Sequence, residues 1–221
     1  MMGSDPLEEF RRAYFGPYDH YLGWHDGYDA DFGVLDRLLP QHRREAEAEL
    51  CEALRTQRAD PRVVLGLGHL RSRAGLPVLH DNLLRFGIYA LGAIASIDPT
   101  ALDANQVVAH LSNKKLSEEP LYGLAIGLGT YFTPAQLDPR VPTQLLELVA
   151  DRRYLVRYHA LGALRRLYQL PDPKAGNGAT ITQADVRSDV IFGLISTDGQ
   201  ANDFRHAQEM LRDQIRAATS P

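Results

Sequence analysis

The stretch DRRYLVRYHALGALRRLYQL, residues 151–170, decides how this chain is interpreted. Projected onto an α-helix at about 100° per residue, its apolar side chains share one side. That stripe consists of Val156, Ala160, Ala163, Leu164 and Leu167. Arg165 and Tyr158 fall roughly opposite the stripe, and Arg157 borders it. Because the arginines are spread around the helix, the pattern favours a scaffold helix over a nucleic-acid grip or an active site.

Segments similar to the middle of this stretch recur along the chain. They are GLGHL at 66–70, ALGAI at 90–94, AIGLG at 125–129 and ALGAL at 160–164, and their central glycines are 24, 35 and 35 residues apart. Each of the two longer intervals holds two helical patterns: 102–111 with 117–132, and 141–150 with 154–170. Equal spacing of this kind indicates an array of helix pairs.

The expected helix starts and the prolines between helices agree with an all-α fold. Asp60 before Pro61 is a favourable helix start, because the carboxylate accepts free amide protons and proline suits the first turn. Six further prolines fall at or near the expected joints: Pro99, Pro120, Pro134, Pro139, Pro142 and Pro171. No run alternates with the period of a strand. Gly162, which costs helix stability, predicts the close approach of a neighbouring backbone.

These residues resemble HEAT-like repeats of the short bacterial kind that phycobilisome-lyase-type proteins also contain. Residues 60–84 resemble the family's Asp-Pro-x-Val start and its Leu-Pro-x-Leu second helix, and 154–164 resembles its Val-Arg-x-x-Ala-x-x-Ala-Leu register. The resemblance implies an α-α superhelix, a right-handed HEAT-like or ARM-type solenoid of stacked antiparallel helix pairs. It also implies contacts between repeats for Arg157, and a concave face that binds a macromolecule.

We therefore expect one solenoid domain over residues 1–221. Residues 1–40 would form an atypical N-terminal cap, 60–170 the recognisable repeats, and 182–217 the C-terminal capping helices. The intervening loop at 171–183, with a helix beginning at Thr182, could contact a partner or serve as a connector.

The N-terminal region is unusually aromatic. Residues 10–32 hold 8 of the 18 aromatic residues of the chain, including its single tryptophan. These side chains could cover the open end of the repeat stack, or they could form a recognition surface, since Trp and Tyr dominate binding hot spots. The candidate partner-binding residues here are Tyr18, Tyr21, Trp24 and Tyr28.

The repeat region adds candidates of its own: Arg153, Arg157, Tyr158 and Arg165. The expected function is a non-catalytic scaffold that binds another protein, which could be basic because residues 1–60 contain 7 Lys and Arg against 13 Asp and Glu. Alternatives are an immunity or antitoxin-type protein, a nucleic-acid-binding HEAT-like protein, and a lyase-like enzyme with a pocket near His159 or Cys51. The net charge of −4 makes nucleic acid the less favoured partner.

Other chemistry finds no support in the pattern. Cys51 lies in a helical pattern typical of a small core residue, and the spacing of His20 and His25 does not suit a metal site. No cofactor motif and no membrane span is predicted, and an acidic start without an apolar centre is not a secretory signal. The sequence thus predicts a cytoplasmic protein without metal or cofactor.

Overall fold

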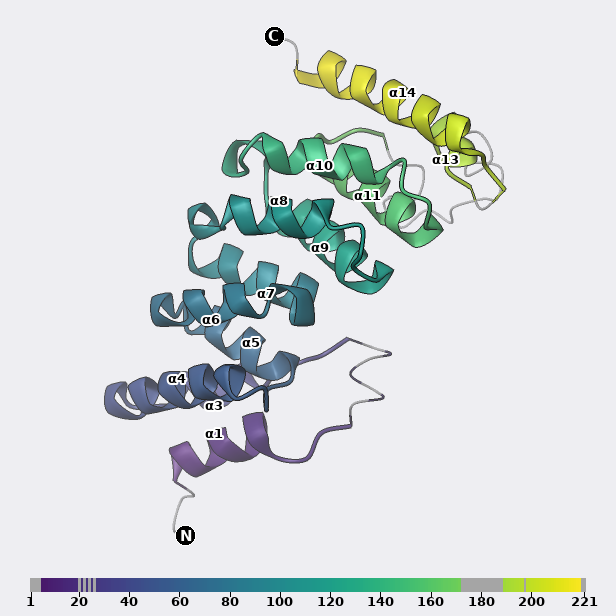
Figure 1. Ribbon diagram of the computed structural model, residues 1–221. Coiled ribbons are helices and arrows are strands. Elements are labelled where there is room, and N and C mark those ends of the chain that lie inside the picture. Colours follow the sequence, from purple (N-terminus) through teal and green to yellow (C-terminus); the bar gives the residue numbers. More distant parts are fainter. Residues whose placement is uncertain are drawn as a thin grey trace. The chain divides into compact units, whose positions relative to one another are not determined.

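The computed structural model describes residues 5–19, 21, 23, 25, 27–171, 189–196 and 198–219. Regular structure in these ranges is helical throughout, without a strand, so the all-α prediction is confirmed. Figure 1 shows α1 (Pro6–Phe15), α3 (Phe32–Asp36), α4 (Pro40–Arg55), α5 (Pro61–His69), α6 (Leu76–Asp81), α7 (Leu83–Ile97), α8 (Ala104–Ser112), α9 (Glu118–Tyr131), α10 (Arg140–Leu148), α11 (Tyr154–Leu167), α13 (Val190–Leu194) and α14 (Ala201–Thr219).

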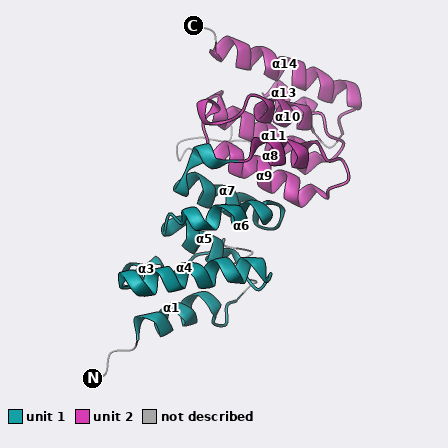
Figure 2. Cartoon of the chain, turned by 60° about the vertical axis from the view of Figure 1, so that its left-hand side comes forward, with its two compact units in different colours: residues 1–102 teal, residues 103–221 magenta. Residues whose placement is uncertain are grey.

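The chain divides into two compact units, residues 1–102 and 103–221, which Figure 2 colours separately. In the first unit, α1 packs on α3 and α4, α4 packs on α5, and α5 lies along α7. In the second, α8 packs on α10, α9 lies along α11, and α14 packs on α10 and α13. The expected single domain and its superhelical course stay predictions.

The helix boundaries follow from the local sequence. Asp60 caps α5, and its Oδ1 accepts a hydrogen bond from the Arg62 amide at 2.9 Å, as the Asp-Pro pair predicts. Pro139 stands at the N-cap of α10, with Pro142 in its first turn. Proline is tolerated there because the first-turn amides have no partner inside the helix.

The apolar stripe predicted for 151–170 is the buried face of α11. All five of its members are buried: Val156, Ala160, Ala163, Leu164 and Leu167. The four glycine-containing segments fall in α5, α7, α9 and α11, the helices that pack side by side as α5 with α7 and α9 with α11. In the first pair, a β-carbon at Gly68 of α5 would lie 2.9 Å from the Ala93 Cα of α7.

The prediction that a backbone approaches Gly162 is wrong. A β-carbon at Gly162 would meet only the Arg166 side chain, at 3.6 Å. The close approach occurs instead at Gly129 of α9, where a β-carbon would lie 2.6 Å from the Ala163 Cα. The sequence pattern identified the right pair of helices, but which glycine faces the neighbour depends on how the two helices are rotated.

Replacing Gly129 with Ala is expected to lower the free energy of unfolding by about 1–3 kcal/mol, because α9 must move away from α11. Gly162→Ala is the matched control on the partner helix. It should be neutral or raise stability by up to about 1 kcal/mol, since alanine favours the helix and has room. Urea denaturation of both variants checks this, and equal effects would contradict the assigned contact.

Candidate binding groove in the first unit

A groove of about 1000 Å³ lies in the first unit. Its walls come from the end of α1 with the segment that follows it, the C-terminal part of α4, and the start of α5. The residues that line it include Phe15, Tyr18, Glu49, Arg58, Arg62 and Arg85.

Arg62 fixes one wall of this groove. Its Nε and Nη2 donate to the Asp60 carboxylate, at 3.1 Å and 2.7 Å, which makes a bidentate pair. Its Nη1 donates to the carbonyl of Ala13 at 2.7 Å, and its Nη2 also donates to that of Gly16 at 3.1 Å. The guanidinium lies 4.3 Å from the centre of the Tyr18 ring. One buried arginine thus holds the aromatic segment against α5.

Three tyrosines continue this attachment. The Tyr18 and Tyr28 rings stack at 5.5 Å, and Tyr28 meets Tyr89 of α7 edge-on at 5.9 Å. The Tyr28 amide donates to the Tyr89 hydroxyl at 3.0 Å. Burial is the main cause that raises the pKa of the Tyr28 phenol. Tyr18 and Tyr28 are therefore partly buried, and they anchor the segment on α5 and α7.

The other described aromatic residues of this segment differ in exposure, and Phe32 is half-buried, with its ring stacked on His69 at 4.5 Å. Phe10 and Tyr14 are fully buried, as a cap over the core requires. Phe15 is 41% exposed and Tyr21 is 68% exposed, so their rings are accessible to a partner. Trp24, the remaining N-terminal candidate, lies outside the described residues. The cap and the accessible surface thus use different side chains of one segment.

The charged side chains at the groove have both signs. Arg58 and Arg85 are exposed, and Arg85 Nη2 donates to the Ala59 carbonyl at 2.7 Å. Glu49 is held by Arg11 of α1, whose Nη2 lies 2.6 Å from Glu49 Oε1. The carboxylates that line the groove, Glu49, Glu52 and Asp60, are thus each paired with an arginine. This arrangement suits polar contacts with a peptide better than proton transfer.

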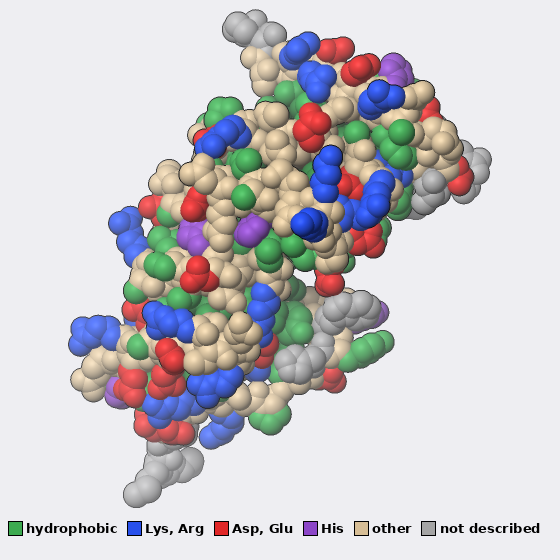
Figure 3. Space-filling model, viewed as in Figure 1, with side chains coloured by type: hydrophobic (Ala, Val, Ile, Leu, Met, Phe, Trp, Pro, Cys, Tyr) green, Lys and Arg blue, Asp and Glu red, His purple; other side chains and the backbone are tan. Residues whose placement is uncertain are grey.

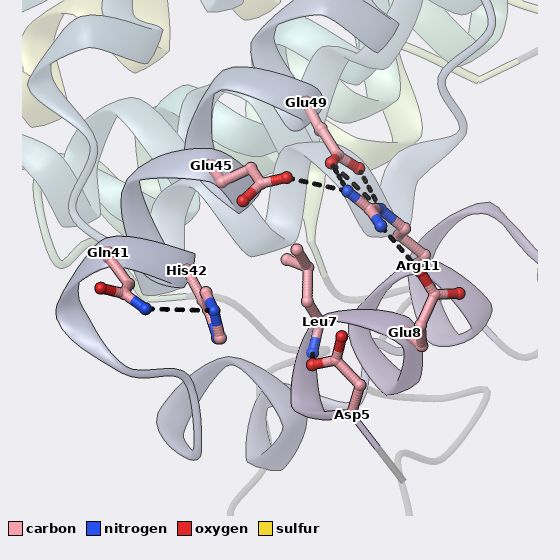
Figure 4. A network of polar contacts seen from close by, with 8 residues as sticks. All are labelled: Asp5, Leu7, Glu8, Arg11, Gln41, His42, Glu45 and Glu49. Atoms are coloured by element: carbon pink, nitrogen blue, oxygen red, sulfur yellow. Dashed lines mark hydrogen bonds and ion pairs between the residues drawn. The ribbon is translucent and has the colours of Figure 1, made fainter.

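Arg11 links α1 to α4, and Figure 4 shows its surroundings. Besides Glu49, it donates to Glu45 at 2.9 Å and to Glu8 at 2.7 Å. The hydrogen bonds to Glu49 and then Glu8 raise the pKa of the guanidinium above its ordinary value. In the same view, Asp5 caps α1 through the Leu7 amide at 3.0 Å. This network sets the position of α1, and with it the groove wall that α1 ends in.

The four candidates of the repeat region do not share a surface. Arg157 and Arg165 are buried, and their guanidiniums bind groups of the fold. Arg153 is half-buried and paired with Asp151, with its Nε 2.8 Å from Oδ1. The Tyr158 ring lies edge-on to His159 at 4.8 Å and to Phe192 at 6.1 Å. Arg157 thus binds Ile195, Ser196 and Phe204 inside the second unit, and its role between repeats stays a prediction.

A motif missed by the sequence analysis organises these contacts. Asp-x-Arg occurs five times in the sequence. At 60–62, 138–140 and 151–153 the arginine amide donates to the Asp Oδ1 at 2.9 Å. The arginine fork also grips the same carboxylate, with Nη2–Oδ2 distances of 2.7–2.9 Å. Each Nη1 then reaches an earlier segment, at Ala13, Asn105 and Leu116 respectively. The spacing alone does not identify these contacts, because Asp203 and Arg205 have the same spacing but bind Gln200 and Asn202 instead.

The second of these pairs, Asp138 with Arg140, can be tested through the pKa of Asp138. The side-chain hydrogen bond from Arg140, followed by the one from its amide, lowers the pKa of Asp138 from 3.8 to about 2. We expect Arg140→Ala to raise that pKa back towards 3.8, as followed by carboxyl NMR during titration. Arg166→Ala, an exposed arginine on α11, should leave it unchanged. An unchanged Asp138 pKa in Arg140→Ala would contradict the pairing of Asp138 with Arg140.

Cys51 and His159, the two residues near which an enzyme pocket was considered, lie in different units. Cys51 is buried in the first unit, and burial raises the pKa of its thiol. His159 lies in the second unit, between the rings of Tyr122 at 5.1 Å and Tyr158 at 4.8 Å. Within the described ranges, no three His, Cys, Asp or Glu side chains gather as a metal ion requires. None of the described helices has the length and apolarity to cross a membrane.

Comparison with known proteins gives no relative: no protein-family model, no curated protein and no solved structure matches this chain.

Proposed function

We propose that this chain is a non-catalytic protein-binding module of HEAT-like helical repeats. In this proposal the groove of the first unit holds a segment of the partner protein. The observation that carries it is the exposed Phe15 ring, at 41% accessibility, on the border of a groove of about 1000 Å³. An aromatic side chain held on a fixed backbone loses little conformational freedom on binding, which is why such residues dominate hot spots.

The backbone around Phe15 supports this role. Arg62 donates to the carbonyls of Ala13 and Gly16. These two carbonyls flank Tyr14 and Phe15 in the sequence. Tyr14 is buried, with its hydroxyl 3.4 Å from the Asp31 carbonyl. Phe15 therefore lies on a backbone that is already fixed at the end of α1. Binding a partner then costs little conformational entropy at this residue.

The charge of the first unit favours a basic partner. Residues 1–102 contain 11 Lys and Arg and 15 Asp and Glu, a net of 11 − 15 = −4. Opposite charge accelerates the encounter of two proteins and disfavours like-charged competitors. An immunity or antitoxin-type protein that neutralises a basic toxin is the narrower form of this proposal.

The test begins with capture of a partner by the tagged chain from a nuclease-treated lysate. The recovered protein is then titrated calorimetrically against purified wild type and variants. Phe15→Ala should weaken binding at least about tenfold, the scale of a hot-spot aromatic. Tyr131→Ala is the matched control, because Tyr131 is 43% exposed at the end of α9 and does not line the groove.

Equal losses in Phe15→Ala and Tyr131→Ala, or none in either, would overturn the groove as the binding site. Recovery of nucleic acid alone without nuclease treatment, released by salt, would favour the nucleic-acid alternative over protein binding.

A further inference from the structure

A second groove, of about 730 Å³, lies within the second unit. It is bordered by the end of α8, the C-terminal part of α10, the turn from α10 to α11, and the first turns of α14. On the face drawn in Figure 3, the right-hand side of this unit carries several Lys and Arg side chains close together, with Asp and Glu among them.

The charged side chains that line this groove are mainly basic: Lys114, Arg152, Arg153 and Arg205, against Glu147 and Asp151. Asp151 and Arg153 bind each other, with Nη2 and Oδ2 2.8 Å apart, so their charges cancel locally. Three cations then remain against one carboxylate.

These three cations are exposed. Lys114 and Arg152 form no ion pair with any residue in the described ranges. Arg205 donates to Asn202, an uncharged neighbour on the same helix. Their charge is therefore available to a ligand, and it is contributed by three separate segments of the chain. A groove built in this way attracts anions into an elongated space.

We propose that this groove binds an Asp- and Glu-rich segment of a protein, as a second contact of the protein-binding function proposed above, on which it rests. Carboxylates are the natural partners of spaced Lys and Arg side chains. Among the described residues, no aromatic side chain lines the groove, whereas single-stranded nucleic acid is usually held by stacking on aromatic rings.

The experiment uses the full chain and a fluorescein-labelled peptide of alternating Glu and Ser. Fluorescence anisotropy at low salt should show saturable binding that weakens as salt is added, because exposed charges are screened. The triple variant Lys114→Ala, Arg152→Ala, Arg205→Ala should bind roughly tenfold more weakly, the sum of three modest ion pairs. Because all three side chains are exposed, the fold should persist, and circular dichroism checks this.

Two neighbours outside the groove supply the control. The double variant Lys115→Ala, Arg216→Ala removes exposed cations beside Lys114 and further along α14, and neither residue lines the groove. It should bind the peptide as wild type does. An equal loss in this variant would overturn the site, since binding would then follow total charge. Absence of saturable binding to wild type would overturn it as well.

Oligothymidylate, a phosphate-containing probe, tests whether the groove binds nucleic acid instead of an acidic peptide. Oligothymidylate that binds more tightly than the peptide, and depends on the same three cations, would make the groove a nucleic-acid site and overturn the proposal. This failure is distinguishable from that of the proposed function, because binding that depends on Phe15 is measured separately in the first unit.

Discussion

Asp189→Ala is expected to lower the free energy of unfolding of the second unit by about 3–5 kcal/mol. Asp189 and Arg165 form a bidentate pair, with Oδ2–Nη1 at 2.6 Å and Oδ1–Nη2 at 3.0 Å. Their side chains are only 8% and 6% exposed, so the variant leaves a cation buried without its carboxylate. It also removes the cap of α13, where Asp189 accepts the Phe192 amide at 3.1 Å. Urea denaturation measures the loss.

The control variant removes the stranded cation. Arg165→Met in the Asp189→Ala background should recover part of the stability, because a buried apolar side chain avoids the desolvation cost. A loss of less than about 1 kcal/mol in Asp189→Ala would mean that the pair behaves as an exposed one. A further loss on adding Arg165→Met would contradict the stranded-charge explanation.

The same pair predicts a dependence on pH. Burial by itself raises the pKa of Asp189, but the hydrogen bonds from Arg165 and from the Phe192 amide outweigh it, and the net pKa lies below the ordinary 3.8. A carboxyl whose pKa is lower in the folded state contributes stability above its unfolded pKa and loses it on protonation. Denaturation midpoints should therefore fall between pH 4 and the lower folded pKa, and less so in the Arg165→Met, Asp189→Ala variant.

Arg157→Ala is expected to cost about 3 kcal/mol or more. The side chain is 2% exposed and binds three carbonyls: Nε to Ile195 at 3.0 Å, Nη1 to Asp151 at 2.8 Å and Nη2 to Ser196 at 2.9 Å. Its guanidinium also lies 3.7 Å from the centre of the Phe204 ring. The variant thus leaves three acceptors without this donor and opens a cavity beside α14.

Arg157→Lys separates charge from geometry. Lysine keeps the positive charge, but it cannot direct planar donors to three carbonyls or stack flat on Phe204. Burial already lowers the pKa of Arg157, so charge alone is not what this site favours. We expect the Lys variant to lose most of the stability that Ala loses. Hydrogen exchange should show the loss concentrated in α13 and α14, and a uniform effect over both units would contradict the assigned contacts.

The position of the helices was available from the sequence because the signals are local. The cap at Asp60, the prolines at the helix joints, and the stripe from Val156 to Leu167 each depend on residues within a few turns. The buried state of Cys51 followed from its helical context in the same way. The sequence could not tell which aromatic residues are buried, because Phe10, Tyr14 and Phe15 belong to one aromatic segment. In the structure Phe10 and Tyr14 are buried, whereas Phe15 is accessible.

What lies over the other faces of each helix was decided by tertiary structure alone. Arg165 falls opposite the apolar stripe, yet it is buried because Asp189, 24 residues away, covers it. Gly129, and not Gly162, admits the neighbouring backbone because of how α9 and α11 are rotated against each other. Helical periodicity identifies only the most apolar face of a single helix. The sequence by itself therefore determined an all-helical chain and its joints, whereas long-range neighbours decided which arginines serve the fold and which remain available to a partner.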